Sequence, residues 1–173
     1  MKKYFSLFFA FLFPYIFVFA MSGFFIIDGM AKHFLTYMLV SFIVILFCFV
    51  LGLTGVVYYL VSAKRSSAGA LRLAKVNMII KLAQIPAFIS LFILAIIYAI
   101  GLFHAAILAV IVFAAIDFLA VLLTGTIGAV AIIINCKEKK VLNIGTVILG
   151  VCQFVFCVDV VAAIVAYKRI KRT

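Results

Sequence analysis

The sequence contains four acidic residues and no tryptophan, and the scarcity of acids limits the chemistry that it can support. A metal-dependent enzyme would have few carboxylates to use, and neither an HExxH, a GxSxG nor a Gly-x-Gly-Asp pattern is present. The four cysteines form no CxxC pair, and no histidine cluster accompanies them. We therefore expect no metal site, no cofactor, no structural disulfide and no enzymatic activity.

Apolar side chains dominate what is present. Hydrophobic residues make up 71% of the 173 residues, and the mean hydropathy is +1.49. Soluble domains are about half apolar, so the surplus must face lipid. The 15 Lys and Arg residues, which give a net charge of +11, lie in short clusters between apolar runs. This pattern is typical of the cytoplasmic loops of membrane proteins and leaves no folded basic surface for nucleic acid.

The sequence predicts an all-α, polytopic transmembrane helix bundle with residues 1–173 in a single domain. A spanning helix needs about 20 apolar residues. Five segments meet this requirement: 4–27, 34–63, 82–102, 105–135 and 141–167. The number of crossings falls to four if one segment does not cross.

The first segment has a competing interpretation as a signal peptide. Its 24 uncharged residues exceed the about 7–15 of a signal-peptide core, so we favour an uncleaved span. Pro14 should kink this helix, and neighbouring helices can bind the backbone carbonyl that it leaves without a partner.

The C-terminal tail conflicts with the usual bias of basic residues toward the cytoplasmic side of the membrane. With a cytoplasmic N-terminus and five spans, ten bases lie inside, but the four bases of the 168–173 tail lie outside with Lys32. The fifth segment could be re-entrant or interfacial, an earlier segment could fail to cross, or the charge bias could be broken. Because residues 141–167 are 27 strongly apolar residues, we expect them to span.

Small residues recur at helical spacing in three spans. The glycines on these faces are Gly52 and Gly55 in the second span, Gly128 in the fourth and Gly145 in the fifth. Lipid supplies no hydrophobic drive between helices, so small faces are where membrane helices approach closely. Helix packing is the favoured role, and for the face of the second span a polar pore wall is the alternative.

Two acids lie inside apolar runs, Asp117 in the fourth span and Asp159 in the fifth. Both are roughly 29–32 Å along their helices from the connecting turn, so they could approach one another. An ionisable residue in a span is a functional candidate. Asp117 and Asp159 could bind a proton or cation during transport, pair with a base of another subunit, or only fix helix packing.

The largest polar region, residues 64–81, is basic and contains no acid. Arg72 and Lys81 would lie on opposite sides of a helix, so we predict a cytoplasmic loop in which Lys81 extends to the headgroups. An anionic lipid headgroup site is the alternative. Its candidate residues are Lys64, Arg65, Arg72 and Lys75.

These features favour a non-enzymatic accessory or interaction subunit in the membrane. Its partners would be the lipid bilayer and another membrane protein, or a second copy in a homo-oligomer, and not nucleic acid. The alternative is a small transporter or channel subunit that uses Asp117. Lys outnumbers Arg by 11 to 4, as in low-GC bacteria, so we expect a bacterial plasma membrane with the N-terminus in the cytoplasm.

Overall fold

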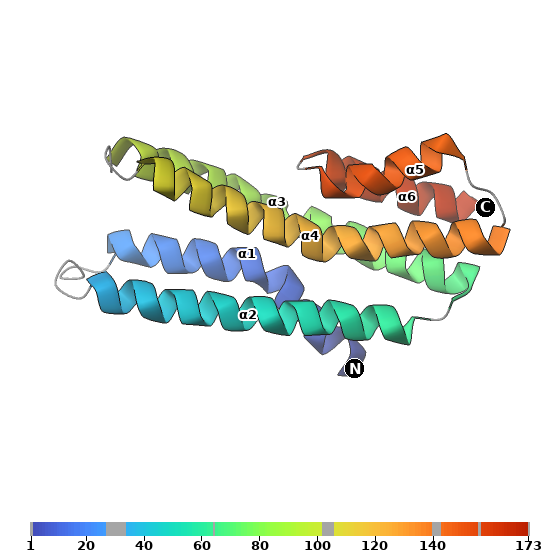
Figure 1. The fold of residues 1–173 in the computed structure, drawn as a ribbon, viewed down its shortest axis with the longest axis horizontal. Coiled ribbons are helices and arrows are strands. Elements are labelled where there is room, and N and C mark those ends of the chain that lie inside the picture. The colour runs from blue at the N-terminus through green and yellow to red at the C-terminus, as the bar shows by residue number, and fades with distance from the viewer. Residues whose placement is uncertain are drawn as a thin grey trace.

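The computed structural model describes residues 2–26, 34–63, 65–101, 106–139, 143–155 and 157–172. Every regular element within these ranges is a helix, which confirms the all-α prediction. Figure 1 shows the elements in chain order, and their bounds are α1 Lys2–Ile26, α2 Phe34–Ser62, α3 Ser67–Gly101, α4 Ala106–Lys139, α5 Ile144–Val151, the 3-10 helix η2 Cys152–Phe154, and α6 Val158–Arg172.

Within the described residues, three helices are long and apolar enough to cross a membrane. Their apolar stretches are Leu39–Ser62 in α2, Ser67–Tyr98 in α3 and Ile111–Lys139 in α4. α1 contributes a shorter apolar stretch, Leu7–Ser22. The predicted first, second and fourth spans therefore match α1, α2 and α4 to within a few residues at each end.

The third helix begins much earlier than predicted. α3 starts at Ser67, so most of the region expected to be a loop, residues 64–81, is helical. Its 35 residues extend about 52 Å, well beyond the ~30 Å hydrocarbon thickness. The first turns carry exposed Arg72 and Lys75, whereas Lys81 lies on the opposite, buried face. Arg72 and Lys81 do lie on opposite sides of the helix, as predicted. The prediction of a loop was wrong because Lys81 is buried between the helices and does not extend to the surface.

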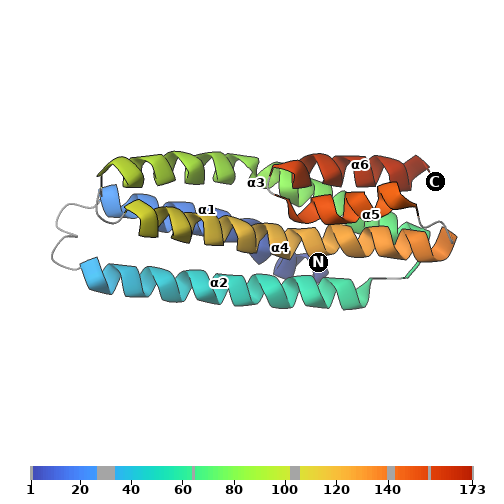
Figure 2. The same cartoon turned by 45° about the horizontal axis from the view of Figure 1, so that its top comes forward.

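The fifth predicted span, 141–167, is not a single helix. Its first apolar helical stretch, Ile144–Phe154, has 11 residues, so its length is only about half the thickness of the hydrocarbon core of a bilayer. The chain then reverses, and α6 returns alongside α5 (Figures 1 and 2). The C-terminal bases therefore lie at the same end of the bundle as the start of α3 and the end of α4. The prediction of one continuous helix over residues 141–167 is therefore wrong, and the chain follows the backbone path that a re-entrant segment would require.

The reversal lacks the usual sequence markers. No glycine or proline occurs between Val151 and Ala163. Cys157 supplies the left-handed backbone conformation instead, with φ of 65°, which is uncommon for a residue with a Cβ. The surrounding contacts must therefore stabilise this turn.

The helices enclose two apolar clusters. One lies toward the basic end and includes Leu73, Ile127 and Ile170; the other includes Phe13, Phe17, Leu91 and Phe113. Along α3, the buried polar residues lie between Leu73 and Leu91.

The proline in α1 shows how a neighbouring helix completes its hydrogen bonding. Pro14 has no N–H to offer the carbonyl of Ala10, one turn earlier. Gln84 Nε2 of α3 donates to that carbonyl oxygen at 3.0 Å. A Cβ on Gly52 of α2 would lie 3.2 Å from the Ala10 backbone, so α1 and α2 also approach closely at this level.

Candidate functional site

One face of α3 carries three buried polar side chains. Asn77, Lys81 and Gln84 follow one another at intervals of four and three residues, which places them on the same side of the helix. Their exposed fractions are 1%, 1% and 0%. This face is turned toward the other helices, so each polar group needs a partner inside the bundle.

The hairpin supplies partners for two of them. Lys81 Nζ donates to Asp159 Oδ2 at 2.7 Å and to the Gln153 carbonyl oxygen at 2.9 Å. Asn77 Nδ2 donates to Gln153 Oε1 at 3.0 Å. Gln153 lies in η2 and Asp159 in the first turn of α6, so these bonds hold both sides of the reversal against α3.

The Lys81–Asp159 pair is deeply buried, with side chains 1% and 3% exposed. Removing both ions from water is costly, and the pair persists because each charge has a counter-ion and the ammonium of Lys81 also donates to the Gln153 carbonyl oxygen. Asp159 also lies at the N-terminal end of α6, where the helix dipole favours a negative charge. The pair therefore compensates its own charges and fixes the depth of the hairpin.

Two glycines of α4 make room for this polar layer. A Cβ on Gly128 would lie 2.5 Å from both Asn77 Nδ2 and Gln153 Oε1. A Cβ on Gly125 would lie 2.7 Å from the Gln153 carbonyl oxygen and 2.9 Å from the Phe154 ring. α4 is thus the surface on which η2 rests, and larger residues at these two positions would displace it.

Asp117 lies in a groove on the outside of this layer. The groove has a volume of about 560 Å³ and is formed by α3, α4, the turn and α6. Asp159 lines the same groove, so the structure brings the two predicted acids to one place. Asp117 Oδ1 is buried and has no hydrogen-bond partner. Much of the remaining lining is apolar and faces outward, with Ile89 57% and Phe92 69% exposed.

The predicted packing glycines have different environments. Gly52 contacts α1, Gly55 is buried in α2, and Gly128 contacts the hairpin. Gly145 is exposed, and among the described residues the position of its Cβ would have one near neighbour, Arg169 Nη1 at 3.7 Å. The prediction that Gly145 lies on a packing face assumed one continuous helix over residues 141–167, and the reversal interrupts that helix.

The predicted lipid-headgroup residues lie at the junction of α2 and α3. Arg65, Arg72 and Lys75 are exposed there, and Lys64 lies outside the described residues. Arg65 lines a surface hollow together with Lys137 and Glu138 of α4. Among the described residues, no three His, Cys, Asp or Glu side chains gather in a way that could hold a metal ion.

Sequence reasoning missed Asn77, Lys81 and Gln153 as site residues. The spacing of Asn77, Lys81 and Gln84 was a usable signal, because three polar residues share one helical face that continues into an apolar run. Gln153 and Asp159, which flank the turn, were the matching signal in the fifth segment. Comparison of the chain with protein-family models, with curated proteins and with solved structures found no match.

Proposed function

We propose that this chain is a non-enzymatic integral membrane subunit that binds another membrane protein laterally, within the bilayer. The observation that supports this role is Asp117, whose Oδ1 is buried without a hydrogen-bond partner in an otherwise largely apolar groove. An intramembrane carboxyl group normally pairs with a neighbouring polar group. In this chain the ammonium of Lys81 is already bound by Asp159 and Gln153.

The occupant that fits the groove is a transmembrane helix of another protein. Its apolar residues would cover Ile89 and Phe92, and one Lys, Arg, Ser or Asn side chain would donate a hydrogen bond to Asp117. Such interhelical bonds contribute about 0.6–2 kcal/mol in membranes, enough to select one partner orientation.

Photocrosslinking in native membranes tests this proposal. A photoreactive phenylalanine analogue at Phe92 should give one defined adduct, and the same analogue at Phe47, 63% exposed on α2, should not. Asp117→Leu should abolish the adduct, whereas Asp117→Asn should retain much of it because an amide still accepts a hydrogen bond. An adduct that does not depend on Asp117 would contradict the proposal, and an adduct with a second copy would identify a homo-oligomer.

The second candidate is a small transporter or channel subunit. It is favoured by the placement of Asp117 and Asp159 in one groove beside a broken helical segment, an arrangement in which transporters bind ions. In this case Asp117→Asn should abolish uptake or ion flux in reconstituted vesicles. If Asp117→Asn retains full function in the cell while Asp117→Leu loses both function and the Phe92 adduct, the transport role is excluded.

The distribution of bases supports an orientation with the basic end in the cytoplasm. Because of the hairpin, the bases of the α2–α3 junction, the end of α4 and the end of α6 gather at one end. Lys32, between α1 and α2, lies outside the described residues. We place α1–α4 across a bacterial plasma membrane, with α5–α6 entering and leaving on the cytoplasmic side.

A further inference from the structure

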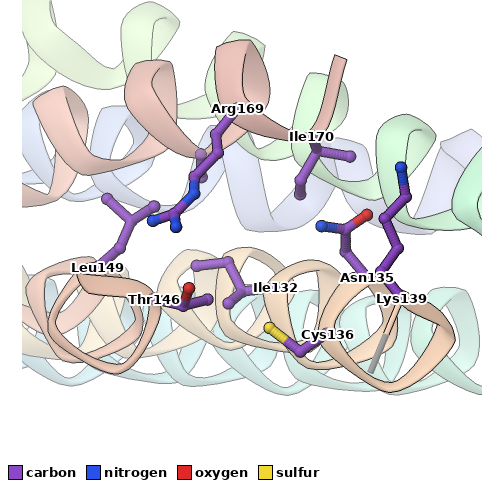
Figure 3. A pocket seen from close by; sticks show the side chains of 9 residues that line it. Ile132, Asn135, Cys136, Lys139, Thr146, Leu149, Arg169 and Ile170 are labelled. Carbon is purple, nitrogen blue, oxygen red and sulfur yellow. The ribbon is translucent and has the colours of Figure 1, made fainter. Parts of the chain in front are cut away.

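A separate pocket opens at the basic end, between α4, α5 and α6 (Figure 3). Its volume is about 110 Å³, several times the roughly 10–15 Å³ that one water molecule needs. Asn135 and Lys139 line it from α4, Thr146 from α5 and Arg169 from α6. Ile132 and Ile170 are among the apolar residues around them. The pocket therefore combines a polar, cationic side with an apolar side.

Two polar groups in the pocket have unmet hydrogen-bonding capacity. Thr146 is only 8% exposed, and its hydroxyl has no hydrogen-bond partner within the part of the chain that the structure describes. Figure 3 shows this hydroxyl directed toward the side of the pocket that carries Arg169. The amide nitrogen of Asn135 points into the same space, while its Oδ1 is buried and unpaired. Acceptor oxygens of a bound ligand would receive hydrogen bonds from the Thr146 hydroxyl and the Asn135 amide nitrogen, whereas the unpaired Oδ1 of Asn135 is itself an acceptor and would need a donor.

The electrostatics of the pocket favour an anion. Lys139 and Arg169 line it, and none of the described residues around it is acidic. Arg169 Nη1 lies 3.7 Å from the Cβ position of Gly145, close to the positive end of the α5 dipole. The first turn of α5 has no acidic residue, and its N-cap Asn143 makes no side-chain capping bond. A cation therefore lies beside a helix N-terminus, an arrangement that a phosphate oxygen would stabilise.

An apolar groove continues from the pocket into the membrane region. It has a volume of about 460 Å³, lies between α4 and α5, and shares Ile132, Cys136 and Thr146 with the pocket. Its far end reaches Gly150 and Phe154, near the turn of the hairpin. A ligand that fills both spaces needs a compact anionic head and an apolar chain.

From this geometry we propose that the α4–α5–α6 pocket binds one anionic phospholipid, with its phosphate between Lys139, Thr146 and Arg169 and an acyl chain in the α4–α5 groove. Basic pockets between membrane helices on the cytoplasmic side suit anionic headgroups. The site lies apart from the Asp117 groove and does not depend on the proposed lateral partner. It also differs from the basic α2–α3 junction that the sequence suggested.

Lipid retention by the full chain tests the proposal. The protein, purified in mild detergent, is given equal amounts of phosphatidylglycerol and phosphatidylcholine and examined by native mass spectrometry. We expect one retained phosphatidylglycerol, favoured about tenfold or more over phosphatidylcholine. Lys139→Gln/Arg169→Gln should abolish this preference, and Thr146→Val should weaken it several-fold without changing net charge.

The matched control is Lys168→Gln/Lys171→Gln, which removes two exposed bases of α6 that do not line the pocket. This variant should keep the preference. If it loses phosphatidylglycerol as completely as the pocket variant, the attraction is a general effect of surface charge and the site is refuted. Retention of phosphatidylcholine equal to that of phosphatidylglycerol would refute it as well.

A further arm separates a lipid from free phosphate. Gly150 has open space where a Cβ would lie and lines the groove, so Gly150→Leu should extend a side chain into the groove and reduce lipid retention. The midpoint temperature of thermal unfolding should rise when phosphatidylglycerol is added and should not rise with millimolar inorganic phosphate. Equal protection by inorganic phosphate, or unchanged lipid retention in Gly150→Leu, would overturn the assignment of the acyl groove. Size-exclusion profiles show whether each variant is folded.

Discussion

Replacing Lys81 by methionine removes the positive charge of the buried pair and keeps a side chain of similar length. The carboxylate of Asp159, whose side chain is 3% exposed, would then lose its counter-ion, and the Gln153 carbonyl would lose the ammonium at 2.9 Å. Breaking a buried pair from one side costs about 3–5 kcal/mol of unfolding free energy. Asp159→Leu should cost a comparable amount because Lys81 would be left charged and buried.

The double variant Lys81→Met/Asp159→Leu tests the physical reasoning more sharply than either single change. With both charges removed, no ion remains uncompensated, and replacing buried pairs by apolar residues is often nearly neutral. We therefore expect the double variant to be more stable than either single variant. The two substitutions should be non-additive by several kcal/mol.

These free energies are measurable by titrating the purified protein in mixed micelles with a denaturing detergent and following helicity by circular dichroism. The control is Lys75→Met, an exposed base near the start of the same helix, which should change stability by about 0.5 kcal/mol or less. Additive costs of the two pair substitutions, or a Lys81→Met protein as stable as Lys75→Met, would refute the claim that this pair holds the hairpin.

Two further predictions concern α4 packing and the position of the tail. Gly128→Ala should destabilise the protein by about 1–3 kcal/mol because the new methyl group overlaps the Gln153 amide, which is already hydrogen-bonded. The control Gly150→Ala, whose Cβ would have no neighbour within 4 Å, should leave stability unchanged or slightly raised. Equal effects of the two substitutions would contradict the packing of η2 against α4. In a cysteine-free background, Lys171→Cys and Lys75→Cys should react with a membrane-impermeant maleimide from the same side of the membrane. Labelling from opposite sides would show that the last segment crosses.

The helices whose bounds could be predicted are those that coincide with one continuous apolar run of the sequence. α2 and α4 begin and end within a few residues of their predicted bounds. α3 was predicted too short because the basic residues of its first turns and Lys81 were treated as one polar region. About two and a half turns of helix separate exposed Arg72 from buried Lys81, so they lie on opposite faces, and only their neighbours distinguish them.

The candidate site was half visible in the sequence. Asp117 and Asp159 stood out because carboxylates are rare in apolar segments. Their placement in one groove depends on the hairpin, which a run of apolar residues without glycine or proline does not reveal. The counter-ion of Asp159 lies 78 residues away in the chain, so no local pattern could identify it.

The amino-acid sequence alone determined that this protein is helical and rich enough in apolar surface to lie in a membrane, because those properties follow from composition and run length. The tertiary structure decided the path of residues 141–167 and the fate of the charges within them. Residues 141–167 contain enough apolar residues to span, but they fold back because polar groups of the turn are hydrogen-bonded. Lys81 and Asn77 donate these hydrogen bonds to Gln153. Whether a charge inside the bundle is free or compensated depends on which helix faces it.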